Sequence, residues 1–566
     1  MRLRGIYEGA AARLFYSADA GVTWIDSGER VALTFGQWKG ARVALFAYGD
    51  GGGAADFDDF VYGPGADAPI DRQALVTRHD PTLTGVDYSA PLTVGNGGFA
   101  FTADITGLQT FSDAYYREGI PLETLSRWCW VTEEAPRAYT LADADAPYSL
   151  PDGRVESFPT RTDGPAADWL RRNPHDHPLA QLALEWIKDD GSPLAPADVQ
   201  APHQVLDLWR GVIVSRYDLG GQAVEVTTAV DPASDTVAVR VDSKLVASGR
   251  LRVRLAFPRG HDLAVKNTPP LDWSHPESHS SRLAGDRIVE RSVGATRYFV
   301  AVDHALRRTG PHAFLIEGEA GRPILAFSVS FAPKPLAAAP AAASVFQASA
   351  KSWPEFWRHA AALDLSGSTN PLAAKLEERV VLSQYLTAVQ MAGAAPPQES
   401  GLTASTWYGK HHTEMIWWHA AHFALWGHPE LLARNLEWYR DHLADARALA
   451  KSRGLAGARW AKMVGPDDRE SPGGNPLIAW NQPSPVYLSE LLYRLEPDAA
   501  TLARYRDLVL ETAESLASMV WLDPRRDRYV LGPPLWIAQE IHDPARSQDP
   551  SFELAYWRFA LGVAQR

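Results

Sequence analysis

The chain has 566 residues, of which 46% are hydrophobic and 22% are charged. This composition is typical of a globular protein and excludes a mainly disordered or collagen-like chain, and no apolar run approaches the ~18 residues of a membrane-spanning helix. The net charge is −13, from 55 basic and 68 acidic residues, which disfavours nucleic acid as a partner. Cys129 is the single cysteine, so an internal disulfide and a thiolate metal cluster are excluded.

The first 65 residues predict a small β unit. Residues 14–17 and 42–48 are short apolar or alternating segments, and the glycine-rich run 49–53 supplies a turn. This stretch resembles the last strands of the concanavalin-like β-sandwich that is appended to some bacterial glycosidases. About half of such a sandwich is present, so we expect residues 1–65 to form part of it and the natural chain to begin upstream of Met1.

Residues 80–331 predict a large antiparallel β-sandwich. Leu251, Val253 and Leu255 alternate with arginines, as in a half-buried strand, and Gly220-Gly221 is a hairpin signal. Many short strands separated by turns favour a sandwich. The clearest predicted strands are 211–219, 222–230, 236–242, 250–257, 297–303 and 323–331.

The chain becomes helical after an alanine- and proline-rich stretch that begins at residue 332. We predict a linker over 332–365 and, over 366–566, an incomplete (α/α)6 toroid built from αα-hairpins. Prolines at first-turn positions and glycines at helix ends mark the boundaries. The predicted helices are 371–393, 413–426, 429–453, 485–495, 501–521 and 551–564.

Residues 396–426 contain the densest set of polar and aromatic side chains. On a helix, His411, Glu414 and Trp418 would lie on one face. Polar groups can bind the hydroxyls of a sugar while an aromatic ring covers its apolar face. The residues of this set that we expect to bind a carbohydrate are Trp407, Lys410, His411, Glu414 and Trp418.

Two other readings of this segment compete with sugar binding. The four histidines 411, 412, 419 and 422 do not form His-Glu-x-x-His and have no downstream partners, so we expect no metal site and no cofactor. An amphipathic core helix with hydrogen-bonded histidines explains Trp417 and His422 well, but it explains residues 407–411 poorly.

A second cluster lies in glycine- and proline-rich loops between the predicted helices. Such loops concentrate binding residues, and an amide can both donate to and accept from a hydroxyl-rich ligand. Asn481 could instead cap the helix that follows it. The candidate sugar-binding residues here are Arg459, Trp460, Asn481 and Gln482.

The third cluster spans residues 529–543 and contains the candidate proton donor, Glu540. Its neighbours Trp536, Ile537 and Ile541 predict an apolar setting, which would raise the pKa of the carboxyl and keep a proton available near neutral pH. Protonating a departing sugar oxygen requires such a group. His542 is a further candidate substrate-binding residue, which could orient Glu540 or belong to the loop surface. Glu553 is a rival carboxyl that could instead be a helix N-terminal acid.

These clusters, in this order after a β-sandwich, resemble the six-hairpin glycosidases of the clan that contains glycoside hydrolase family 65. Residues 95–99 resemble the Gly-Asn-Gly motif that opens the family's sandwich, and 457–460 resemble its Lys-Gly-Ala-x-x-Pro-Trp segment. Residues 407–414 resemble the sugar-lining segment that ends in Thr-Glu. Residues 532–542 resemble Gly-Pro-Asp-Glu-Tyr-His, although six residues here replace the one that precedes the glutamate.

The resemblance implies that Glu540 is the general acid and that Trp407, His411 and Glu414 hold the sugar. It also implies a twelve-helix toroid, of which six helices are predicted here, so we expect the general base to lie beyond residue 566. A secreted or periplasmic location would follow if an export signal precedes Met1.

The expected function is hydrolysis of an oligo- or polysaccharide by an inverting acid/base mechanism. The alternatives are a glycoside phosphorylase, a non-catalytic carbohydrate-binding protein, and a polysaccharide lyase with Tyr408 as base. The expected partner is a carbohydrate substrate, with no nucleic acid and no membrane.

Overall fold

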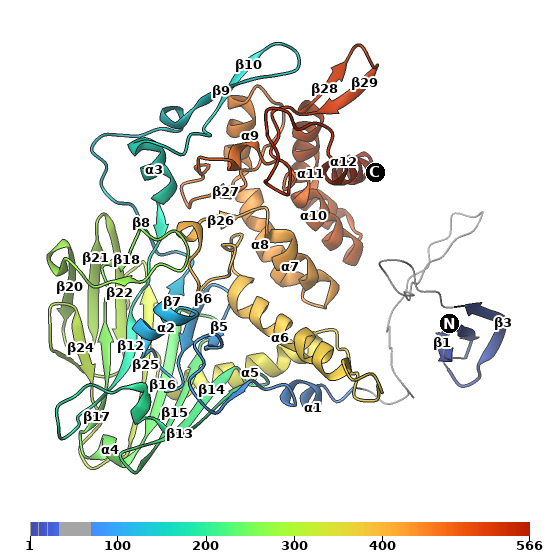
Figure 1. The fold of residues 1–566 in the computed structure, drawn as a ribbon. Coiled ribbons are helices and arrows are strands. Elements are labelled where there is room, and N and C mark those ends of the chain that lie inside the picture. The colour runs from blue at the N-terminus through green and yellow to red at the C-terminus, as the bar shows by residue number, and fades with distance from the viewer. Residues whose placement is uncertain (1, 9–10, 20, 33–69) are drawn as a thin grey trace. The chain divides into compact units, whose positions relative to one another are not determined.

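The computed structural model describes residues 2–8, 11–19, 21–32 and 70–566, and the chain divides into two compact units, residues 1–67 and 68–566 (Figure 1). The described part of the first unit is an antiparallel three-stranded sheet in the order β1-β2-β3. The predicted strand at 14–17 lies within β2, and the one at 42–48 lies outside the described residues. The strand bounds are β1 Arg2–Glu8, β2 Ala11–Ser17 and β3 Ile25–Ala32.

The second unit is built on a nine-stranded antiparallel sheet, the largest among residues 70–566. Its order is β20-β21-β22-β25-β16-β15-β14-β13-β4, so the chain crosses from one half of the sheet to the other between β16 and β20. The six clearest predicted strands all occur, within one residue at each end. The bounds in sheet order are His279–Ala284, Ile288–Val293, Thr296–Val302, Ile324–Ala332, Thr236–Asp242, Gln222–Val230, Val212–Leu219, Gln200–Asp207 and Thr82–Leu83, while the sixth predicted strand is Leu251–Ala256 of the facing sheet.

Smaller sheets lie across the same core. Alternate residues of neighbouring strands, such as Val226 and Val239, enter one cluster with Leu182 and Leu255 of the four-stranded sheet. This pairing of two inward faces is why the strands alternate between buried and exposed side chains. The four-stranded sheet is β12 Gln181–Trp186, β17 Leu251–Ala256, β24 Ala313–Ile316 and β23 Leu306–Arg308, and the three-stranded sheet is β5 Leu92–Gly95, β6 Phe99–Ala103 and β7 Thr124–Ser126.

Short elements complete this part of the chain. The helices are α1 Arg72–Thr77, α2 Ser112–Glu118, α3 Pro165–Arg172 and α4 Lys244–Ala247. The paired short strands are β8 Trp130–Val131 with β11 His175–Asp176, β9 Ala146–Ser149 with β10 Val155–Phe158, and β18 Gly260–His261 with β19 Leu271–Asp272.

Part of the predicted linker is a helix. Residues Ala342–His359 form α5, which packs against β14, β15, β16 and β25. The alanine-rich composition favours a helix, and the side chains of Val345 and Trp357 are buried against the sandwich. The prolines before residue 341 concealed this helix in the sequence.

The helical part begins with α6, which contacts β5 and β6, and continues in succession to α12 (yellow to dark red in Figure 1). The predicted helix 429–453 is two helices, because the chain breaks at His442, whose ring stacks on Trp438 at 4.6 Å. The bounds are α6 Ala373–Met391, α7 Ile416–Leu425, α8 Pro429–Asp441, α9 Leu443–Ser452, α10 Ser484–Leu495, α11 Ala499–Ser518 and α12 Ser551–Gln565.

These helices form stacked αα-hairpins. Helix α7 packs against α8, α10 against α11, and α10 in turn against α7, α8 and α12. One core, which contains Ile416, Leu436, Leu488 and Leu508, joins α7, α8, α10 and α11, and a second, with Leu516 and Trp557, joins α11 to α12. The predicted fold class, a large antiparallel β-sandwich followed by αα-hairpins of the (α/α)6 kind, is confirmed.

Candidate active site

The segment with most of the predicted binding residues begins with a strained turn. Trp407, Tyr408 and Gly409 form a 3-10 turn, η4, with positive φ angles of 51°, 60° and 73°. For non-glycine residues such angles persist only where the surroundings enforce them. The sandwich supplies the enforcing contact: Ser405 Oγ donates to Asp176 Oδ1 at 2.8 Å, and a Cβ on Gly409 would lie 2.3 Å from Cγ of Asp176.

After the turn the chain is extended rather than helical. Residues His411–His412 form β26, which pairs with β27, Met463–Val464, and the N–H of Thr413 donates to the carbonyl of Lys462 at 2.9 Å. Helix α7 therefore starts only at Ile416. The prediction that His411, Glu414 and Trp418 share a helix face is wrong, because the backbone groups of residues 411–413 are used in this two-stranded ladder.

Lys410 and His411 are buried beside the sandwich. Lys410 Nζ donates to the carbonyl of Pro174 at 2.6 Å, and burial lowers its pKa to about 7. The His411 ring lies edge-on to Trp130, with ring centroids 5.2 Å apart, and burial lowers its pKa to about 3. His411 is therefore neutral at neutral pH, and the contacts of both side chains fasten the segment to the sandwich.

Two carboxylates from distant segments meet at one lysine. Lys462 Nζ lies 3.0 Å from Glu414 Oε1 and 2.8 Å from Glu540 Oε1. The side chains of Lys462 and Glu414 are 5% and 8% exposed, whereas that of Glu540 is 38% exposed. Glu414 precedes α7, Lys462 precedes β27, and Glu540 lies in the loop before α12, so the αα-hairpins bring all three together.

The buried carboxyl of this cluster has the perturbed pKa. Burial raises the pKa of Glu414 to about 7, the ammonium of Lys462 opposes that rise, and the charges of Glu540 and Glu399 add to it. A carboxyl with such a pKa exchanges its proton near neutral pH, as acid/base chemistry requires.

The prediction of an apolar, desolvated setting for Glu540 is wrong. Its neighbour Ile541 is exposed, and the Trp536 ring lies against Gly474, where an added Cβ would be 1.4 Å from the ring. Glu540 itself has a positive φ of 56° and is held by Lys462. Trp536 and Ile537 pack against other parts of the chain, which their sequence spacing could not reveal.

The rival carboxyl, Glu553, supports the same loop from α12. It is buried, and its Oε1 accepts a hydrogen bond from the N–H of Ala538 at 3.0 Å. Burial raises the pKa of its carboxyl. Glu553 therefore fixes the backbone two residues before Glu540.

Trp407 lies at the rim of the cluster, between the sandwich and the hairpins. Its indole Nε1 donates to Glu399 Oε2 at 2.8 Å, and its N–H donates to Asn267 Oδ1 at 3.0 Å. Lys266 Nζ lies 3.4 Å from the ring centroid, so a cation covers one face of the indole. Lys266 and Glu399 have no motif of their own and were not predicted from the sequence, in which Lys462 also does not stand out from its segment.

The second predicted cluster is buried and bonded within the chain. The N–H of Trp460 donates to Gln482 Oε1, and Gln482 Nε2 donates to the carbonyl of Trp460. Asn481 Nδ2 donates to Thr413 Oγ1 at 2.9 Å. Arg459 Nη2 donates to the carbonyl of Pro476 at 2.7 Å. Asn481 is not the N-cap of α10, which is Pro483. These side chains fix the segment that carries Lys462.

An exposed aromatic group lies next to these amides. Trp418 is 52% exposed and packs edge-on against Trp480, with ring centroids 5.3 Å apart. Phe552, also exposed, lies 6.0 Å from Trp480. His542 is exposed, two residues after Glu540. The ring of Trp418 is therefore accessible to solvent, four residues after Glu414 in the chain.

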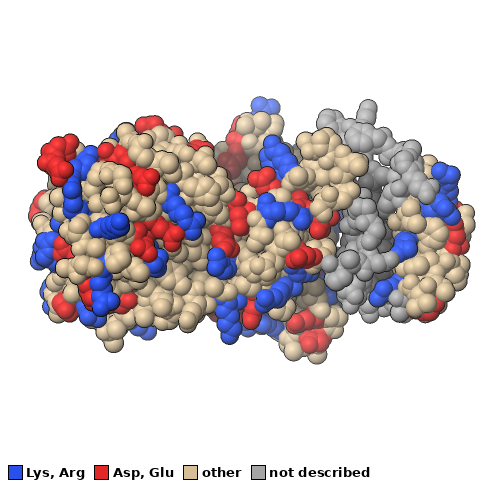
Figure 2. Space-filling view, turned by 90° about the horizontal axis from the view of Figure 1, so that it is seen from below, with Lys and Arg blue, Asp and Glu red and all other residues tan. Residues whose placement is uncertain are grey.

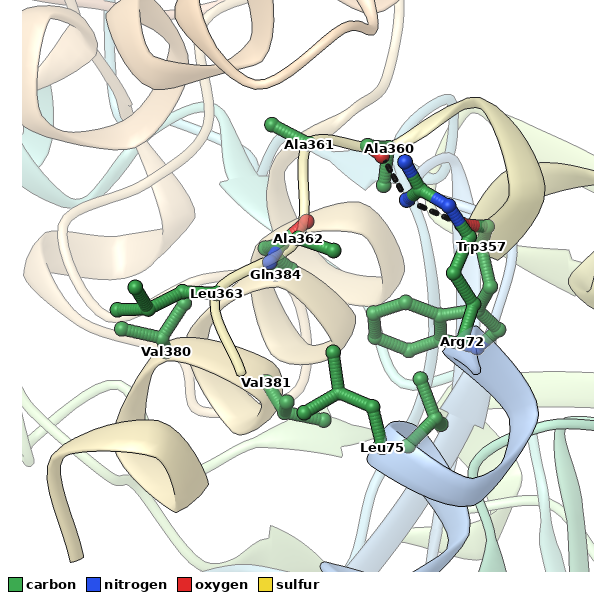
Figure 3. A pocket seen from close by; sticks show the side chains of 11 residues that line it. Arg72, Leu75, Trp357, Ala360, Ala361, Ala362, Leu363, Val380, Val381 and Gln384 are labelled. Carbon is green, nitrogen blue, oxygen red and sulfur yellow. Dashed lines mark hydrogen bonds between the residues drawn. The ribbon is translucent and has the colours of Figure 1, made fainter. Parts of the chain in front are cut away.

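Two small cavities are lined by residues other than Glu414, Lys462 and Glu540. One lies between α1, α5 and α6, where Arg72 donates to the carbonyls of Trp357 and Ala360, and its volume of about 10 Å³ is at the lower limit for one water (Figure 3). The other, of about 20 Å³, is lined in part by Arg127 and His411. Both are too small for a sugar, so the candidate site is the cluster around Lys462, where Glu540 is exposed.

Residues 2–8, 11–19, 21–32 and 70–566 contain no group of three His, Cys, Asp or Glu side chains arranged to hold a metal ion. Within the same ranges, every helix is too short or too polar to cross a lipid bilayer. On the face shown in Figure 2, basic and acidic side chains are interspersed.

Comparison with known proteins shows the fold of the chain. No protein-family model matches it, and no curated protein matches its sequence. A solved structure named "Putative kojibiose phosphorylase from human microbiome" is similar over 79% of this chain, with a TM-score of 0.53 and 11% identity. A bacterial glucoamylase complexed with acarbose aligns over 85% of this chain and 68% of its own, with a TM-score of 0.37 and 11% identity.

The chain spans 59% of the length of the first of these structures. At this identity the similarity establishes the arrangement of β-sandwich and αα-hairpins, and it leaves the chemistry to be argued from the residues.

Proposed function

We propose that this protein is a carbohydrate-active enzyme that hydrolyses O-glycosidic bonds of an oligo- or polysaccharide at the Glu414–Lys462–Glu540 cluster. The observation that carries the proposal is that two carboxyls from separate hairpins meet at one buried lysine. Glycoside hydrolysis needs carboxyl groups in two protonation states beside the scissile bond. The fold, which is that of a structure named as a phosphorylase, supports the same class of substrate.

Glu540 is the proposed proton donor to the leaving oxygen, because it is the exposed carboxyl of the cluster and a bound sugar can touch it. Trp407 and Trp418 are the proposed platforms for sugar rings, and His542 a proposed rim contact. The amides and the arginine of the second cluster act by holding Lys462 in place.

The proposed stereochemical course is inversion, with the base outside this pair. Glu414 and Glu540 each lie within 3.0 Å of the same nitrogen, so their nearer oxygens are less than about 6 Å apart, closer than the ~6.5–9.5 Å that an inverting acid and base require. An inverting course therefore requires a third carboxylate to activate the water.

Phosphorolysis is the second candidate, favoured by the name of the similar structure. Phosphate would replace water as the nucleophile, and Lys266 is a cation at the rim that could meet it. Turnover that rises with added phosphate would support phosphorolysis and contradict simple hydrolysis. Affinity for sugars without any turnover would support a binding protein instead.

The proposal is tested by incubating the purified full-length protein with α- and β-linked glucosides and glucans and following the anomeric proton of the product by NMR. We expect Glu540→Gln to lower kcat about 10²- to 10⁴-fold, the usual contribution of a general acid. The matched control is Glu319→Gln, a carboxyl exposed on the sandwich. Full activity of the Glu540 variant contradicts the acid assignment, and a product with retained configuration contradicts inversion.

A further inference from the structure

Lys462 is held more firmly than a surface lysine. Its carbonyl accepts the N–H of Thr413, and Thr413 Oγ1 donates to the adjacent carbonyl of Ala461 at 2.6 Å. Only 5% of its side chain is exposed, so the ammonium is fixed at the end of a buried stem. Within residues 70–566, it is the one cation in ion-pair contact with Glu414 or Glu540.

The cluster carries more negative charge than the lysine can balance. With both carboxyls ionised, two negative charges face one ammonium, and Glu399 adds a third charge nearby. His412 also faces Lys462, but burial lowers its pKa to about 3, so it brings no charge at neutral pH. The excess favours uptake of one proton by the pair of carboxyls.

The two carboxyls differ in how far water can reach them. The Glu414 side chain is 8% exposed and that of Glu540 is 38% exposed. Water can therefore solvate a charge on Glu540 and scarcely reaches Glu414. Glu540 also has a strained backbone, with φ at 56°, and its side chain is held by the ammonium.

We propose that Lys462 is a positioning residue, which holds Glu540 at the exposed edge of the cluster and supplies the counter-charge of the buried Glu414. This inference rests on the proposed function for its catalytic consequence. Its electrostatic consequence concerns the folded protein alone. Removing the ammonium frees the Glu540 side chain and leaves Glu414 without its counter-charge.

The electrostatic half is tested by infrared titration of the full chain, with Glu414 assigned by subtracting the spectrum of Glu414→Gln. Because an opposite charge at such distances shifts a pKa by about 1–3 units, we expect Lys462→Met to raise the Glu414 midpoint by about one unit or more. Lys462→Arg should keep the wild-type midpoint. Lys451→Met, on the exposed face of α9, is the control and should change nothing.

An unchanged Glu414 midpoint in a Lys462→Met protein that is folded by circular dichroism overturns the inference, whether or not the protein is an enzyme. If Lys462→Met does not fold, the midpoint in Lys462→Arg decides: a shift as large as one unit overturns the role of the ammonium.

The catalytic half is tested on whichever glycoside the wild type turns over. We expect Lys462→Met to lower kcat about 100-fold with little change in KM and to move the basic limb of the pH profile upward, while Lys462→Arg restores most of kcat. Equal loss in both variants with normal folding overturns positioning by charge. Absence of turnover in the wild type overturns the proposed function and, with it, the catalytic consequence of this inference. The titration still decides the electrostatic consequence.

Discussion

Glu414 shows how burial changes the chemistry of one carboxyl. Its pKa rises from 4.5 to about 7 because the side chain is enclosed, and Lys462 offsets only part of that rise. The sequence predicted this property for Glu540, which is instead at the exposed edge of the cluster. Proximity to apolar residues in the sequence did not decide which glutamate would be desolvated.

The raised pKa of Glu414 makes the stability of the protein depend on pH. The folded state binds this proton more tightly than the unfolded state, so the contribution is present below pH 4.5 and is lost as pH rises through 7. We expect the difference in unfolding free energy between wild type and Glu414→Gln to change by about 3 kcal/mol between pH 4 and pH 8. Urea denaturation at several pH values measures it, and a constant difference contradicts the shift.

At the scale of elements, loops from both parts of the second unit build the site. The 407–409 turn is held against Asp176 of β11, and Asp176 also lies 3.5 Å from His261 of β18. Glu123 on the other side of that histidine, together with Asp176, raises its pKa to about 10. A buried ionic network of the sandwich thus supports the turn that leads to Glu414.

Gly409 is the point of closest approach in that turn. We expect Gly409→Ala to cost about 3 kcal/mol or more, because its φ is +73° and the new Cβ would overlap Asp176. The matched control is Gly221→Ala, in the β14–β15 hairpin, where φ is +76° and nothing lies within 4 Å. Its cost should be about 1–2 kcal/mol, from the backbone angle alone. Equal losses in chemical denaturation would show that the contact with Asp176 does not constrain the turn.

At the scale of the second unit, α5 joins the sandwich to the hairpins. Trp357 is buried in the sandwich core, and its Nε1 donates to the carbonyl of Leu208 at 2.7 Å. Both α1 and the nine-stranded sheet contact this helix. Disrupting α5 should therefore destabilise the surface of the sandwich against which α6 and the following hairpins pack.

We expect Trp357→Ala to lower the free energy of unfolding by about 3–5 kcal/mol, the usual cost of emptying a buried tryptophan site. The matched control is Trp273, which directly follows β19 and is 41% exposed. Its substitution by alanine should cost about 1 kcal/mol or less. A loss at Trp357 no larger than at Trp273 would show that α5 is not part of the core.

The sequence by itself determined the regular elements. Alternating valines specify strands β14 to β16, and proline and glycine positions specify most helix ends, because both signals depend on neighbours a few residues away. Helix α5 and the break at His442 escaped prediction, because a composition bias hid the first and the second, where φ is −102° and ψ 16°, has no glycine or proline to mark it.

Only the tertiary structure decided the chemistry of the site. Glu414, Lys462 and Glu540 are far apart in the chain, and no spacing rule relates them. Their protonation and orientation depend on which side chain water can reach once the hairpins pack, and that is a property of the assembled core rather than of any one segment.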